Sequence, residues 1–134
     1  MTFVRVVVAL NGAVYLLTGI ALLFAPQWFF DNIGTSAPFN RHYMGDLGGF
    51  SLALGGILLL GLWMPAWQPG ALAVAAVGGT LHALNHAVDA VRGTGGWDQT
   101  IALGILAAIT VAATVQAPFG ARREAKASLP TVRA

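Results

Sequence analysis

Four long apolar runs limit what this chain can fold into. They cover roughly residues 3–24, 40–63, 71–91 and 98–117. Each run holds about 20 residues, which as a helix is long enough to cross the ~30 Å hydrocarbon core of a bilayer. Only 9% of the residues are charged and 57% are hydrophobic, whereas a soluble domain usually carries about 25% charged residues. The sequence therefore predicts an all-α integral membrane protein, a four-transmembrane-helix bundle.

Helix-breaking and capping residues mark the ends of these runs. Pro26 ends the first helix, because proline lacks an amide donor and disfavours helical geometry at the residue before it. We expect the second helix to begin near Asn40, and the fourth to begin at Asp98, placed as an N-cap. Pro118 and Gly120 are expected to end the fourth helix. The transmembrane domain is thus predicted over residues 1–120.

The basic residues predict an orientation. Residues 121–134 form a basic tail that we expect to be disordered or to lie on anionic lipid headgroups. If four helices cross, both termini share one side, which then carries Arg5, Arg122, Arg123, Lys126 and Arg133. The other side has only Arg41 and Arg92. Because short segments rich in lysine and arginine stay on the cytoplasmic side of a membrane, both termini are predicted to be cytoplasmic. The net charge of +2 is thus a topology signal and indicates no nucleic-acid partner.

Two short polar windows interrupt the apolar runs. His82, His86 and Asp89 are spaced i, i+4 and i+7, so they share one face of a helix. His42 and Asp46 are spaced i, i+4 in the second run. An ionisable group at membrane depth is costly and indicates a functional site. The second helix begins, and the third ends, on the outer side, so we expect both windows to meet in the outer half of the bilayer.

The residue types in these windows favour a metal site, because imidazole nitrogens and carboxylate oxygens are ligands of zinc, iron and manganese. The candidate ligands are His42, Asp46, His82, His86 and Asp89, and the candidate cofactor-binding residues are Arg41 and Asn85. Haem on one or two histidines, a quinone headgroup, another small polar ligand and a purely structural polar network are the alternatives. The glutamate of an HExxH zinc helix is missing, so no metalloprotease is implied. No residue is assigned as catalytic.

Small residues in the second run predict close helix packing. Gly45 and Gly49, and likewise Ser51 and Gly55, have the small-xxx-small spacing that lets membrane helices approach closely. A binding groove is the alternative reading of these glycines. The chain has no cysteine, which excludes disulfides, thiolate metal sites, thiol catalysis and cysteine-attached haem.

Three segments carry a resemblance to a known family: NGAVYLLTGIALLFAPQWFF, NRHYMGDLGGF and HALNHAVD. Over about residues 11–89 the chain resembles the DoxX-like group of small four-helix bacterial membrane proteins, in an uncharacterised branch. The resemblance implies a compact four-helix bundle in the bacterial cytoplasmic membrane. The group's name-giving member is similar to a small subunit of a thiosulfate:quinone oxidoreductase. The absence of cysteine here leaves a sulfur-handling cysteine mechanism without support.

The sequence thus predicts a multi-pass membrane protein with an outer-half His/Asp site. That site would bind a divalent transition metal, a cofactor or a small polar ligand, as in a redox accessory component. The alternative is a non-catalytic membrane scaffold or accessory subunit whose His/Asp network is structural. The expected partners are the lipid bilayer and either further copies of the chain or a membrane partner subunit.

Overall fold

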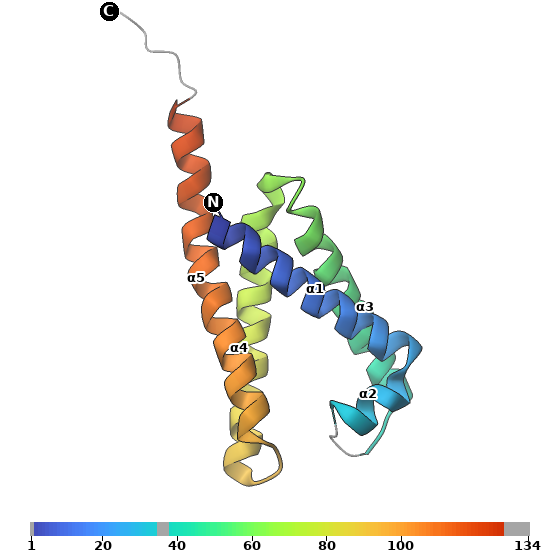
Figure 1. The fold of residues 1–134 in the computed structure, drawn as a ribbon. Helices are drawn as coiled ribbons and strands as arrows, with labels where there is room; N and C mark the ends of the chain where they lie inside the picture. The colour runs from blue at the N-terminus through green and yellow to red at the C-terminus, as the bar shows by residue number, and fades with distance from the viewer. Residues whose placement is uncertain (1, 35–37, 128–134) are drawn as a thin grey trace, which may run out of the picture. The chain divides into compact units, whose positions relative to one another are not determined.

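A computed structural model describes residues 2–34 and 38–127 of the chain, and these residues form helices and connecting turns without any strand. The elements, in order, are α1 (Thr2–Phe24), α2 (Pro26–Asn32), α3 (Arg41–Leu60), the 3₁₀ helix η1 (Pro65–Trp67), α4 (Gln68–Arg92) and α5 (Trp97–Ala127) (Figure 1). The predicted all-α class is confirmed.

Four of these helices are long and apolar enough to cross a membrane. The candidate spans are Phe3–Phe24, Arg41–Leu60, Pro65–Arg92 and Trp97–Ala117. They contain 22, 20, 28 and 21 residues, and a crossing needs about 20. The prediction of four spanning helices in a multi-pass membrane protein is therefore confirmed by helix length and composition.

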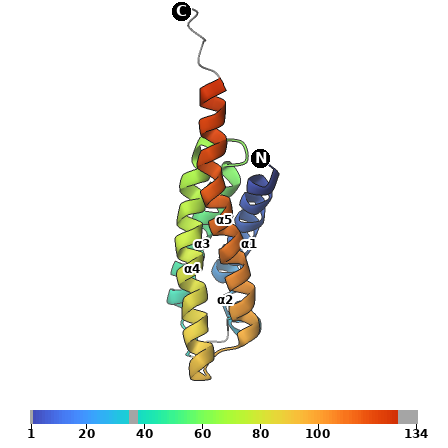
Figure 2. The ribbon, with the colours of Figure 1, turned by 90° about the vertical axis from the view of Figure 1, so that its left-hand side faces the viewer.

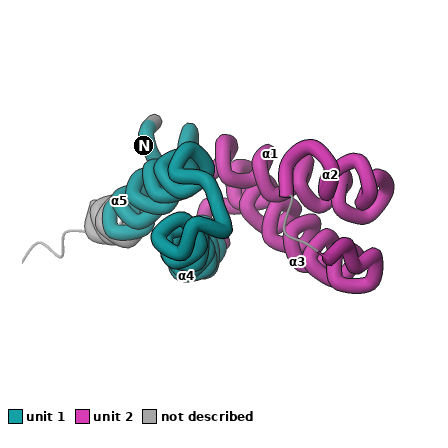
Figure 3. The backbone as a smooth tube through the Cα atoms, turned by 90° about the horizontal axis from the view of Figure 1, so that it is seen from below, with its two compact units in different colours: residues 1–7, 68–134 teal, residues 8–67 magenta. Residues whose placement is uncertain are grey.

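The chain divides into two compact units (Figure 3). One unit is residues 8–67, which contain α2, α3 and most of α1. The other is residues 1–7 and 68–134, which contain α4 and α5.

In the unit of residues 8–67, α1 and α3 pack in opposite directions with their backbones in contact. A Cβ atom built on Gly55 would lie 2.5 Å from the Leu16 backbone nitrogen, and one on Gly19 would lie 2.5 Å from the Leu52 backbone nitrogen. Since real Cβ atoms do not approach other atoms so closely, only glycine fits at these two positions. Small residues therefore bring these helices together, as they do in membrane bundles generally.

One side of α3 provides this contact. Its buried residues recur at alternating intervals of four and three, which is the spacing of one helix face, and they are Met44, Gly48, Ser51, Gly55 and Leu58. The packing predicted for Ser51 and Gly55 is therefore confirmed. Gly45 and Gly49 lie on another side of α3, where an added Cβ atom would meet nothing within 4 Å among the described residues.

In the other unit, α4 and α5 run side by side, as both Figure 1 and Figure 2 show. The turn between them caps α4. Gly93 has a φ of +73°, a left-handed conformation that glycine adopts without steric cost. The Gly93 amide donates to the Ala90 carbonyl (3.2 Å) and the Thr94 amide donates to the Asp89 carbonyl (2.9 Å). These two hydrogen bonds form a Schellman motif, so the glycine-rich segment is a helix end.

The structure adds one short helix that was not predicted, and both ends of α5 differ from the prediction. Pro26 ends α1 as expected but also opens α2, because a proline in the first turn loses no intrahelical hydrogen bond. Asp98 lies in the first turn of α5 rather than before it, where its charge still complements the helix dipole.

The predicted end of the fourth helix at Pro118 and Gly120 is wrong, because α5 continues to Ala127. Residues 121–127 are alanine, arginine, glutamate and lysine, which are all strong helix formers. Their helix propensity offsets the cost of the backbone hydrogen bond that a proline cannot donate. The first half of the predicted tail is therefore helical. Residues 128–134 lie outside the described residues.

Candidate functional site

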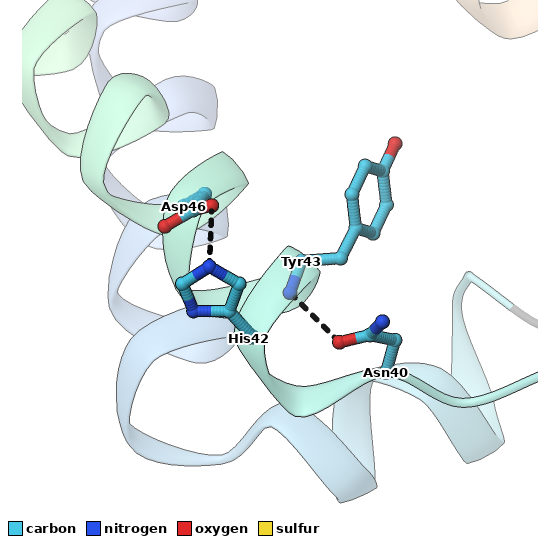
Figure 4. A network of polar contacts seen from close by, with 4 residues as sticks. All are labelled: Asn40, His42, Tyr43 and Asp46. Atoms are coloured by element: carbon cyan, nitrogen blue, oxygen red, sulfur yellow. Dashed lines mark hydrogen bonds and ion pairs between the residues drawn. The ribbon is translucent and has the colours of Figure 1, made fainter.

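The start of α3 is fixed by a side-chain cap. Asn40 precedes the helix with extended backbone angles (φ −137°, ψ 105°), and its side-chain oxygen accepts a hydrogen bond of 3.1 Å from the Tyr43 amide (Figure 4). This bond satisfies one of the amides that a helix N-terminus leaves without an intrahelical partner. The cap thereby fixes where α3 begins, and so the positions of His42 and Asp46 in its first turns.

His42 and Asp46 form an ion pair one turn into α3. The His42 Nε2 atom lies 3.4 Å from the Asp46 Oδ2 atom (Figure 4). Their side chains are 89% and 61% exposed, so the pair is accessible from outside the unit to which it belongs. The prediction that these residues share a helix face is confirmed.

The second pair lies on α4. The ring centroids of His82 and His86 are 4.7 Å apart and the rings meet edge to face at 76°. One turn further along, Asp89 lies near the helix end, where its backbone carbonyl accepts hydrogen bonds from the amide (2.9 Å) and hydroxyl (3.2 Å) of Thr94. Two imidazoles held one turn apart can ligate a single transition-metal ion, and the ring nitrogens of both are suited to zinc, copper, iron or nickel.

The two candidate cofactor-binding residues are exposed. Arg41 is the first residue of α3, next to His42, and Asn85 lies on α4 between the two histidines. Their side chains offer hydrogen-bond donors that suit an anionic or carbonyl-bearing ligand beside either pair.

The structure thus brings together His42 with Asp46, and His82 with His86, and these two pairs belong to different units. Over residues 2–34 and 38–127, no group of three or more histidine, cysteine, aspartate or glutamate side chains gathers in a way that could hold a metal ion. The metal site with five ligands stays a prediction.

Comparisons with protein-family models, curated proteins and solved structures find no match for this chain. The DoxX-like assignment likewise stays a prediction.

Sequence reasoning did not anticipate a groove between α4 and α5. It has a volume of about 550 Å³ and is lined by Thr80, Ala83, Leu84, Ala87, Thr100, Gly104, Ala107, Ala108 and Val111. Small residues spaced i, i+4 on both helices were the available signal, because they leave room between two packed backbones. The groove is apolar apart from two threonines, and the Thr100 hydroxyl already donates to the Gly96 carbonyl at 3.0 Å.

Proposed function

We propose that this chain is a multi-pass protein of the bacterial cytoplasmic membrane that binds a divalent transition metal, or a cofactor carrying one, at the histidines of α4. The name-giving member of the DoxX-like group that the chain resembles is similar to a subunit of a thiosulfate:quinone oxidoreductase, so the bound species would serve a redox component of the membrane. The outer half of the bilayer is the expected depth of the site, because α4 ends there if both termini are cytoplasmic.

The contact between His82 and His86 is the observation that supports this proposal. Their rings lie 4.7 Å apart on a helix apolar enough to span a membrane. Two polar rings side by side at such a depth lower the stability of the helix in lipid unless another group binds them. A metal ion that is coordinated by one nitrogen of each ring would offset this loss of stability.

The remaining ligands would be further carboxylate oxygens and an imidazole nitrogen. Asp89 follows His86 on α4, and the exposed Asp46 and His42 of α3 have the right chemistry for a mixed nitrogen and oxygen ligand set. Arg41 and Asn85 would contact a small polar ligand or cofactor beside the metal. A haem or a quinone headgroup would use the same histidines.

The test is elemental analysis and an absorption spectrum of the detergent-purified protein, followed by titration with Zn²⁺ and Cu²⁺. We expect about one metal ion or one chromophore per chain in the wild type, lost in His82→Ala and in His86→Ala. Leu84→Ala shortens a side chain on the same turns of α4 and should retain it. Loss in His42→Ala as well would show that both pairs ligate the same ion. A wild type that binds none of these species contradicts the proposal.

A non-catalytic scaffold is the second candidate, and the His42–Asp46 pair favours it. These two side chains already pair with each other within a single helix, at 3.4 Å, and so need no further ligand to be partly satisfied. In a scaffold, the histidine variants of α4 would lower the melting temperature without releasing any bound species. The same purification distinguishes the two functions.

A further inference from the structure

The register of α1 against α3 places the start of α3 beyond the end of α1. A Cβ atom built on Gly48 of α3 would lie 3.0 Å from the Leu22 Cβ atom of α1, so these two residues are level with each other. The two helices run in opposite directions, and α1 ends two residues after Leu22, at Phe24. The end of α1 is therefore about level with Asp46. With a rise of about 1.5 Å per residue, residues 41–45 extend about 7 Å past it.

The short helix α2 lies beside this extension of α3 (Figure 1). It begins at Pro26, one residue after α1 ends. The Phe30 ring of α2 meets the Phe39 ring edge to face, with 5.3 Å between the centroids, and Phe39 lies just before α3 begins. α2 is thus held at the level of the first turns of α3, which carry the His42–Asp46 pair.

α2 combines aromatic and polar side chains in the way that suits a membrane surface. Phe29 and Phe30 are partly buried, whereas Trp28 is 54% exposed, on a side of the helix that also carries Gln27 and Asp31. The side-chain amide of Gln27 donates to the carboxylate of Asp31 at 2.9 Å. Because tryptophan has an apolar ring and a single N–H donor, it is most stable at the boundary between hydrocarbon and headgroups.

The apolar length of the α1 and α3 pair fits this level as one membrane surface. Neither residues 6–24 of α1 nor residues 47–60 of α3 include a charged residue. Tyr43, in the first turn of α3, is 62% exposed, and Trp63, just after the helix, is 75% exposed. Roughly 20 residues separate these two aromatic side chains, which is about 30 Å along a helix and matches the hydrocarbon core of a bilayer.

We propose that α2 is an interfacial helix that binds the lipid surface. It lies at the boundary between headgroups and acyl chains, with the Trp28 ring among the lipids. The His42–Asp46 pair then lies at headgroup depth, where water reaches it, and avoids the cost of ionisable groups in hydrocarbon. The depth follows from residues 8–67 alone, because α2 joins two candidate spans at one end of the pair that they form. It is the same in either leaflet, with or without a metal ion at α4.

Quenching by brominated lipids tests the depth of Trp28. Replacing Trp63, Trp67 and Trp97 by phenylalanine leaves it as the only tryptophan of the chain. In phosphatidylcholine vesicles, bromine atoms near the carbonyl end of the acyl chains should quench its fluorescence at least about two-fold more than bromine atoms near the chain end. Equal quenching or stronger quenching by the deeper bromine atoms overturns the proposal. So does the absence of quenching by either lipid, since protein would then cover the ring.

Single cysteines test the depth of the His42–Asp46 pair with every tryptophan in place, and the chain has no cysteine of its own. Phe50→Cys is the matched control for His42→Cys. The two native side chains are similarly exposed, at 79% and 89%, but Phe50 lies about two turns deeper along α3.

The cysteine variants are compared in open membrane fragments, in which a membrane-impermeant maleimide reaches both surfaces. The maleimide should label His42→Cys at least about ten-fold faster than Phe50→Cys, because the reactive thiolate forms in contact with water and not in an apolar environment. Labelling of Phe50→Cys as fast as that of His42→Cys, or no labelling of His42→Cys, overturns the proposal.

Discussion

Gly55 and Gly56 are adjacent in the chain and have opposite surroundings. A Cβ atom on Gly55 would lie 2.5 Å from the backbone nitrogen of Leu16 in α1, and one on Gly56 would meet nothing within 4 Å. The same substitution at two neighbouring residues therefore measures how much close backbone packing contributes to the fold.

Gly55→Ala should destabilise the unit of residues 8–67 by about 1–3 kcal/mol, because the added methyl group forces α1 and α3 apart. Gly56→Ala should leave stability unchanged or raise it by up to about 1 kcal/mol, since alanine is the better helix former. Unfolding in mixed detergent micelles, followed by circular dichroism, gives both values. Equal effects of the two substitutions would show that the contact between α1 and α3 is not at backbone distance.

At the scale of single elements, the start of α3 is fixed by a side-chain cap. The Asn40 side chain accepts the hydrogen bond of the Tyr43 amide, and this cap sets the position of His42 and Asp46. Asn40→Ala should cost about 1 kcal/mol of stability, because the amide loses its partner. Asn40→Asp should retain nearly all of it, because aspartate caps equally well. The free energy of unfolding measures both effects. An unchanged free energy of unfolding in Asn40→Ala would mean that the cap does not stabilise α3.

The elements also show which structural features could be predicted from the sequence. The spans of α1, α3 and α4 follow from their apolar length, and the faces that pair His42 with Asp46 and His82 with His86 follow from helical periodicity. The end of α5 did not follow, because a local rule for proline competes with the helix propensity of the residues after it.

The expected contact between the His42–Asp46 pair and the His82–His86 pair is harder to predict from the sequence than a helix span or a helix face. It depends on contacts between residues some forty positions apart, which neither periodicity nor spacing encodes. Likewise, the spacing of Gly45 and Gly49 and that of Ser51 and Gly55 look alike in the sequence, yet only the second packs against α1. Which side of a glycine-rich helix is used depends on the partner's shape, here on Gly12 and Gly19 of α1.

At the scale of the whole molecule, four spans put alternate connections on opposite sides of the membrane. The turn containing Thr94, between α4 and α5, is then on the same side as the start of α3, and η1 is on the side of the termini. In the sequence, five of the seven basic residues precede or follow the four spans at the two termini or lie at the very start of the first span, and the other two, Arg41 and Arg92, lie at the start of α3 and the end of α4. This asymmetry predicts that η1 and both termini face the cytoplasm.

Single cysteines test this orientation, because the chain has none of its own. Thr94→Cys and Ala66→Cys place a thiol in two exposed turns, at opposite ends of α4. In intact cells a membrane-impermeant maleimide should label Thr94→Cys, whereas Ala66→Cys should react only after the cells are permeabilised. The reverse pattern would put both polar pairs in the inner half of the bilayer. Labelling of both variants in intact cells would contradict α4 as a membrane span, since a helix that crosses the bilayer separates its two ends.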